Sequence, residues 1–195
     1  DGDTSCSPDI GPGLDRFCER AQQMDVTRVY GRAAGRPGVH GFFSRPSAGS
    51  ACKRLNLFLR WMVRRDGIDL GTWTGVPASR LIIPLDVHVI RVGQCLGLTS
   101  YKTAGWRMAA DITTSLRTID PDDPVRYDFA LCHIGMLHLC GFNQPTGDSQ
   151  CPLGAHAGRA LVDREGLVHH PFHAEARTHP LQARLAHLRP ERRVV

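Results

Sequence analysis

The stretch SACKRLNLFLRWMVRRDGIDLGTWTGVPASRLIIPLDVHV, residues 50–89, contains two expected helix starts around which the rest of the chain is arranged. Apolar residues near its beginning recur at the spacing of one helix face, at Leu55, Phe58, Leu59 and Met62. Ser50 is a suitable N-cap for this helix. The pattern predicts a helix of about four turns with Lys53 in its first turn.

Lys53 and Asp86 stand at these two helix starts. Unpaired backbone N–H groups and the positive end of the helix dipole disfavour an ammonium group in a first turn, which makes the amine of Lys53 a better nucleophile. The apolar segment 81–85 leads into Asp86, which precedes a second periodic apolar run. A carboxylate at that place is a good N-cap by itself, and it remains available for chemistry if it borders a cleft.

Two segments, KRLNLFLRWMVR (53–64) and IIPLDVHV (82–89), resemble the catalytic core of the helix-hairpin-helix DNA glycosylase superfamily. In that superfamily a lysine opens one helix, and an aspartate in a Val/Ile-Pro-x-Asp-x-His/Arg-Val context opens a later one. The interval of 33 residues (86 − 53) is similar to that of archaeal 8-oxoguanine glycosylases. Residues 49–135 also resemble an uncharacterised bacterial family related to this superfamily. The usual Leu-Pro-Gly-Val-Gly hairpin is absent, and RPSAGSACK occupies its place, so an irregular hairpin is expected.

The resemblance implies a DNA glycosylase, with or without lyase activity at the abasic site. Lys53 would attack C1′ of a nucleotide extruded from the duplex, and Asp86 would stabilise the positive charge on the sugar or assist proton transfer. By the same resemblance the base is an oxidised purine. A hypermodified pyrimidine of the phage type stays open, and it would make the protein a phage-defence factor and not a DNA-repair enzyme.

The net charge of +5 is unevenly distributed. Residues 45–107 contain ten Lys or Arg and three acids, a net charge of +7, whereas residues 108–154 contain two Arg and six Asp, a net charge of −4. The positive region surrounds Lys53 and Asp86. Such a field suits a polyanionic partner such as DNA, although a solvated helix face is an equally simple explanation of the charges alone.

Further contacts with DNA are expected from basic and aromatic side chains of the same region. The candidates for phosphate contact are Arg54, Arg60, Arg64, His88 and Arg91. The candidates for base stacking are Phe42, Phe43 and Trp73, whereas Trp61 is expected in the core. Aromatic residues in loops more often cover the core than bind a ligand, which is the competing interpretation for the stacking candidates.

The whole pattern predicts an all-α, helix-hairpin-helix glycosylase-like fold. Residues 1–155 are expected to form the helical domain, and the His- and Arg-rich segment 156–195 to pack on it. Further helices are predicted at 14–24, 104–116 and 125–131, the last opened by an N-cap at Asp123, and a loop at 31–49. No apolar run reaches the ~20 residues of a membrane span. We expect a monomeric, cytoplasmic, nucleoid-associated protein without a cofactor.

The seven cysteines are predicted to be reduced thiols. Cys132, Cys140 and Cys151 are weak candidates for a zinc site, because their spacing matches no tight CxxC pair.

Two alternatives to the enzyme stay open. One is a non-catalytic DNA-binding module of the same fold, and the other is a metal-containing regulatory or structural protein built around these cysteines.

Overall fold

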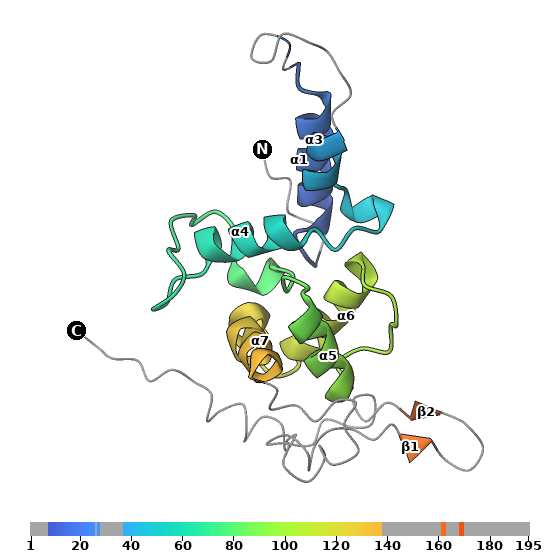
Figure 1. The fold of residues 1–195 in the computed structure, drawn as a ribbon. Coiled ribbons are helices and arrows are strands. Elements are labelled where there is room, and N and C mark those ends of the chain that lie inside the picture. Colours follow the sequence, from blue (N-terminus) through green and yellow to red (C-terminus); the bar gives the residue numbers. More distant parts are fainter. Residues whose placement is uncertain (1–7, 26, 28–36, 138–160, 163–167, 170–195) are drawn as a thin grey trace.

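The computed structural model describes residues 8–25, 27, 37–137, 161–162 and 168–169, and this part of the chain is mostly helical (Figure 1). Its α-helices are α1 (Gly11–Gln23), α3 (Pro37–Phe42), α4 (Lys53–Val63), α5 (Val87–Cys95), α6 (Trp106–Arg117) and α7 (Asp128–Met136). Short 3-10 helices occur at η1 (Pro46–Ala48), η2 (Ala78–Arg80) and η3 (Pro124–Tyr127). The predicted all-α class is confirmed for this part of the chain.

Two short strands form the sheet of the described residues. β1 (Leu161–Val162) pairs antiparallel with β2 (Val168–His169), with Leu161 opposite His169 and Val162 opposite Val168. The remainder of segment 156–195, and its predicted packing on the domain, lies outside the described residues. None of the helices in the described ranges is long and apolar enough to cross a membrane.

The main core surrounds the extended apolar segment 81–85. Ile82 and Ile83 of this segment are at most 1% exposed, and they lie in one cluster with buried residues of α5, α6 and α7. The backbone N–H of Ile83 donates a hydrogen bond to Oγ1 of Thr113 on α6 (3.0 Å), which satisfies a polar group that the core would otherwise leave unpaired. The core therefore holds segment 81–85 in place, and Asp86 follows directly after it.

Helices α5 and α7 lie side by side (Figure 1). A glycine permits this approach, because a Cβ at Gly135 would lie 2.6 Å from Cβ of His88 and 3.0 Å from its Cα. Any larger residue at this position would push the two helices apart. The packing brings the middle of α7 against the N-terminus of α5, where Asp86 is located.

A second, smaller cluster fixes the beginning of α4 against α1. Leu14 and Cys18 of α1 pack against Cys52 and Leu55 at the start of α4. The thiol of Cys52 also donates a hydrogen bond to the carbonyl oxygen of Ser44 (3.0 Å). The N-terminal helix thus supports the turn from which Lys53 emerges.

Several local details differ from the sequence predictions. The segment expected as a loop contains α3 and η1. Helix α4 has 11 residues, about three turns, and it begins after Cys52, whose φ of 48° is left-handed, so Ser50 is not the N-cap. Instead Oγ of Ser50 accepts a hydrogen bond from the N–H of Cys52 (3.2 Å). Asp123 makes no capping hydrogen bond either, because its carboxylate binds Arg64.

Candidate functional site

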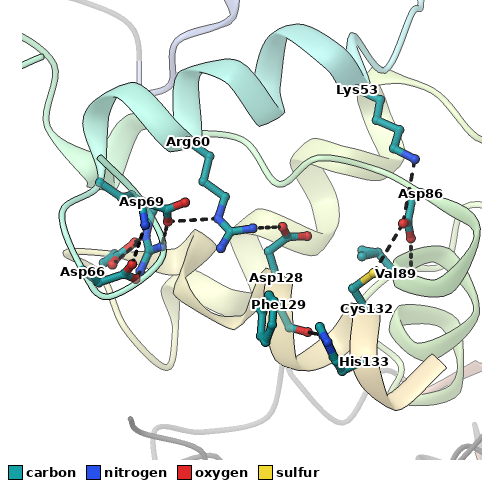
Figure 2. A network of polar contacts seen from close by, with 12 residues as sticks. Lys53, Arg60, Asp66, Asp69, Asp86, Val89, Asp128, Phe129, Cys132 and His133 are labelled. Atoms are coloured by element: carbon teal, nitrogen blue, oxygen red, sulfur yellow. Dashed lines mark hydrogen bonds and ion pairs between the residues drawn. The ribbon is translucent and has the colours of Figure 1, made fainter. Parts of the chain in front are cut away.

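Lys53 and Asp86 meet at the point where α4 and α5 begin. Lys53 is the first residue of α4, and Asp86 is the N-cap of α5. Nζ of Lys53 lies 3.8 Å from Oδ2 of Asp86 (Figure 2). The lysine side chain is 51% exposed and the aspartate side chain 17% exposed, so the pair lies at the surface with its carboxylate partly sheltered. The two residues that the sequence singled out are therefore brought together.

The two carboxylate oxygens of Asp86 have separate surroundings. Oδ1 accepts hydrogen bonds from the backbone N–H groups of His88 and Val89, both at 2.9 Å, which is the geometry of a helix N-cap. Oδ2 takes no part in this cap and lies near the amine of Lys53. Asp86 is thus a structural cap and an available carboxylate at once, because the cap fixes one oxygen and leaves the other for the site.

Cys132 of α7 is a third member of this site. Its Sγ lies 3.5 Å from Oδ2 of Asp86 and is placed to donate a hydrogen bond to it. Burial, and next to it the negative charge of Asp86, raise the pKa of the Cys132 thiol to about 11. The side chain is therefore a neutral thiol at physiological pH, and it stabilises the ionised form of the carboxylate without competing as a charged nucleophile.

An exposed surface of α7 continues from Cys132. Phe129 and Met136 are 44% and 52% exposed, and Sδ of Met136 lies 3.8 Å from Sγ of Cys132. The ring of His133 lies over that of Phe129, with centroids 3.8 Å apart, and its Nδ1 donates to the carbonyl oxygen of Phe129 (2.9 Å). An aromatic and thioether surface thus adjoins Cys132, the residue that contacts Asp86, and Figure 2 shows Phe129 and His133 of this surface on the same helix. Sequence reasoning missed it, although positions 129, 132, 133 and 136 have the spacing of one helix face.

Arg60 and Arg64 do not face solvent, which corrects their prediction as phosphate contacts. They are 4% and 6% exposed, respectively. Arg60 binds Asp128 through Nη1 (2.6 Å) and Asp69 through Nε (3.2 Å), and Arg64 binds Asp69 and Asp123. Their guanidinium groups are already used by carboxylates inside the protein, so neither is available to a ligand.

This buried network fixes the geometry of the exposed pair. Arg60 of α4 reaches Asp128 of α7, one helical turn before Cys132, so it joins the helix that carries Lys53 to the helix that contacts Asp86 (Figure 2). Burial raises the pKa of Asp128 to about 6, although the charge of Arg60 opposes this rise. The charge of Asp86 acts in the same direction as burial. Asp128 is therefore ionised at neutral pH and pairs with Arg60 there.

Three other predicted contact residues have different environments. Arg54 and Arg91 are exposed, and the guanidinium of Arg54 lies 5.9 Å from the centre of the Phe42 ring. His88 is half-buried against Gly135, and its buried Nδ1 has no hydrogen-bond partner among the described residues. Arg54 and Arg91 remain accessible to an anion, whereas Nδ1 of His88 faces the helix interface.

The predicted stacking residues belong to two separate aromatic groups. Phe42 and Phe43 pack edge to face, 4.9 Å between centroids, and Phe43 also contacts Phe17 of α1 (5.8 Å). Trp73 packs edge to face on Phe58 of α4 (5.5 Å). On α7, which carries Cys132, the exposed aromatic ring is that of Phe129.

The described residues contain no group of three or more His, Cys, Asp or Glu side chains placed to hold a metal ion. Among the three cysteines considered for zinc, Cys132 contacts Asp86 and Met136. Cys140 and Cys151 lie outside the described residues.

Comparison with known proteins identifies a family for the chain. Residues 4–137 match the family described as "protein of unknown function (DUF2400)", which is well over half of the 195 residues, and the chain belongs to this family. No curated protein matches the chain, and no solved structure matches it.

Proposed function

We propose that this DUF2400 protein is a DNA glycosylase of helix-hairpin-helix type that excises a damaged or modified base from duplex DNA. The observation that carries the proposal is the approach of Nζ of Lys53 to Oδ2 of Asp86, 3.8 Å apart, at the starts of α4 and α5. An amine can attack the sugar carbon of an extruded nucleotide, and a fixed carboxylate beside it can offset the positive charge of the transition state. The resemblance of segments 53–64 and 82–89 to glycosylases supports the same chemistry.

The proposed reaction begins with proton transfer from the Lys53 ammonium to Asp86 or to water. The neutral amine then forms a bond to C1′ while the C1′–N bond breaks, and the base leaves with that electron pair and takes up the proton that Asp86 or water received from the amine. Asp86 is again ionised during bond cleavage, when the sugar is most positive. Opening of the sugar ring gives a Schiff base, which either hydrolyses or continues to strand scission. If Lys53 only orients the nucleotide, Asp86 activates water and the product is an intact strand with an abasic site.

The exposed surface of α7 gives this reaction a receptor for the base. Phe129 and Met136 are both substantially exposed and share one helix face with Cys132, which touches Asp86. A flat heteroaromatic ring can stack on such a surface while its sugar lies over the Lys53–Asp86 pair. An oxidised purine is the first substrate to test, and a hypermodified pyrimidine is the second.

Two of the predicted phosphate contacts support binding of the duplex itself. Arg54 and Arg91 are exposed and belong to the same two helices as Lys53 and Asp86. Each phosphate that such a side chain neutralises makes affinity fall more steeply with salt. Replacing either arginine by glutamine should therefore weaken binding to all sequences alike and reduce the salt dependence.

The proposal is tested by measuring base release from duplexes that carry oxidised, deaminated, alkylated or hypermodified bases. Released bases are identified by mass spectrometry, and abasic sites by cleavage in alkali. Lys53→Gln and Asp86→Asn should lose release but keep DNA binding. The matched control is Lys102→Gln, because Lys53 and Lys102 are the only lysines of the chain. Lys102 is exposed and is not part of the contacts between Lys53, Asp86 and Cys132. If the wild-type protein releases no base from any duplex yet binds DNA, a non-catalytic binding module replaces the enzyme.

A further inference from the structure

A second exposed aromatic surface lies on α4. Phe58 and Trp61 of this helix and Trp73 of the following loop are each 43% exposed, and we call these three residues the aromatic face. Trp61, which the sequence predicted in the core, is thus a surface residue. Three large rings exposed on adjoining segments are unusual for a solvated surface and indicate an interaction site.

Backbone hydrogen bonds fix the aromatic face. The N–H groups of Leu70 and Gly71 donate to the carbonyl oxygen of Trp61 (3.0 and 3.1 Å), and that of Trp73 donates to the carbonyl oxygen of Met62 (2.7 Å). These carbonyls belong to the last turn of α4, where intrahelical partners are lacking. The loop is thereby attached to the end of the helix, and the position of Trp73 is set by the fold.

A glycine and a ring contact complete this arrangement. Gly71 has a φ of 60°, and a Cβ there would lie 2.4 Å from Cβ of Arg65, so only glycine fits the reversal of the chain. After this reversal Trp73 packs on Phe58 with ring planes at 83° and centroids 5.5 Å apart. An edge-to-face pair supports both rings and leaves part of each accessible. The fold holds the rings in place without burying them.

The unpaired charges around the aromatic face are positive. Arg54 and Arg65 are exposed near its two ends, and neither forms an ion pair with another residue in the described part of the chain. The nearby Asp66 is neutralised by Arg64 (2.9 Å). Stacking rings with cations beside them fit unpaired nucleic acid, in which bases stack on the rings and phosphates meet the guanidinium groups.

The position of the face along α4 relates it to the candidate site. Phe58 and Trp61 follow Lys53 by five and eight residues. At 1.5 Å per residue they lie about 7 and 12 Å further along the helix. With stacked bases about 3.4 Å apart, this distance corresponds to roughly two to four nucleotides.

We propose that the aromatic face binds unpaired bases of the DNA strand next to the nucleotide that Lys53 attacks. The partner is DNA because of the proposed function, on which this inference rests. Base stacking on Phe58, Trp61 and Trp73 can be tested separately from the proposed reaction, because it requires bases but no chemistry at Lys53. A strand opened around the extruded nucleotide would be held by stacking as well as by its phosphates.

Binding of short oligonucleotides to the full chain tests the inference, with Lys53→Gln as the background so that no reaction occurs. The probes are an oligothymidylate and an abasic oligomer of the same length, which carries the same phosphates without bases. The oligothymidylate should quench tryptophan fluorescence and bind more tightly than the abasic oligomer. Phe58→Ala and Trp73→Ala should each weaken its binding by about 5- to 150-fold, the range for one stacked base, and leave the abasic oligomer unaffected.

Tyr101→Ala is the matched control, since Tyr101 is 42% exposed and belongs to neither surface. Trp73→Phe preserves an aromatic ring, so it should retain most of the affinity while losing part of the quenching signal, whether or not the alanine variant folds. Equal affinity of the two oligomers, or of Trp73→Ala and Tyr101→Ala, would overturn the inference. Absence of base release in the earlier assay, with quenching intact, would refute the glycosylase and leave the stacking surface standing.

Discussion

Replacing Arg60 with methionine should lower the free energy of unfolding by about 3–5 kcal/mol, because the variant leaves the buried carboxylate of Asp128 without its ion-pair partner. Arg60 is 4% exposed and binds Asp128 at 2.6 Å and Asp69 at 3.2 Å, and the side chain of Asp69 is fully buried. Arg64 still binds Asp69 in the variant, whereas Asp128 loses its ion pair. Methionine fills the volume of the arginine stem, so the loss measures the charge network and not a cavity.

The same variant should show a characteristic pH dependence. The pKa of Asp128 is about 6 with Arg60 present, and burial is the main reason it lies above 3.8. Arg60 lowers this pKa, so its removal raises it further. Well below pH 6 Asp128 is mostly protonated in both proteins, and the ion pair contributes less to the wild type. The difference in stability between wild type and variant should therefore shrink as the pH falls from about 8 to about 5.

Urea denaturation followed by circular dichroism measures this difference. Arg54→Met is the matched control, because it makes the same substitution on the exposed side of the same helix, and it should cost no more than about 0.5 kcal/mol. Equal losses in Arg60→Met and Arg54→Met, or a loss in Arg60→Met that stays constant with pH, would refute the role assigned to the network.

Three further predictions follow from the packing and from two shifted pKa values. Gly135→Ala should lower the free energy of unfolding, measured in urea, by about 1–3 kcal/mol. Gly41→Ala is the control and should have no such effect, because a Cβ at Gly41 meets no atom within 4 Å. Equal effects of the two substitutions would contradict the close approach of α5 and α7. Asp128 binds a proton more tightly in the folded state than in the unfolded state, so its contribution to the free energy of unfolding should fall by about 3 kcal/mol as the pH rises from about 4 to about 7. Urea titrations of Asp128→Asn must lack this pH-dependent change. Alkylation of Cys132, followed by peptide mass spectrometry, should become half-maximal near pH 11 and at lower pH in Asp86→Asn, and a wild-type value near pH 9 would refute its burial beside a carboxylate.

The positions of Lys53 and Asp86 at helix starts could be predicted from the sequence, because helix starts have local signals. Asp86 follows an apolar segment, precedes a periodic run and has the right side chain for an N-cap, and all three signals are local in the sequence. Lys53 is less well marked, since its helix begins after a left-handed Cys52 and not after a capping Ser50. The prediction that Lys53 lies in the first turn relied on Ser50 as the cap, and it is correct although the helix begins later than that cap would place it.

The environments of Arg60 and Trp61 could not be inferred in the same way. Helical periodicity assigned Arg60 to the polar side, Trp61 was expected in the core, and the fold reverses both. Arg60 is buried because Asp128, 68 residues away, meets it across the interface of α4 and α7. Trp61 is 43% exposed, and the loop that follows α4 contacts its backbone carbonyl through the N–H groups of Leu70 and Gly71. Contacts between residues so distant in sequence leave no signal in a single helix pattern.

The surface of α7 illustrates a different limit. Phe129, Cys132 and Met136 have the spacing of one helix face, which is equally typical of a core-facing stripe. Only the packing of α5 on α7 around Gly135 places this face beside Asp86 and leaves Phe129 exposed. The residues of the candidate site were thus partly visible in the sequence, but their assembly required the fold.

Borohydride trapping of the protein on a duplex with a modified base or an abasic site is the decisive measurement for the proposed chemistry. Reduction of a Schiff base leaves the DNA fragment covalently attached to one lysine. The chain contains only Lys53 and Lys102, so peptide mapping identifies the attachment site without ambiguity. We predict an adduct on Lys53 that is lost in Lys53→Gln and retained in Lys102→Gln. An adduct on Lys102 or on the N-terminal amine, or no adduct on a duplex from which the protein releases the base, would contradict Lys53 as the nucleophile.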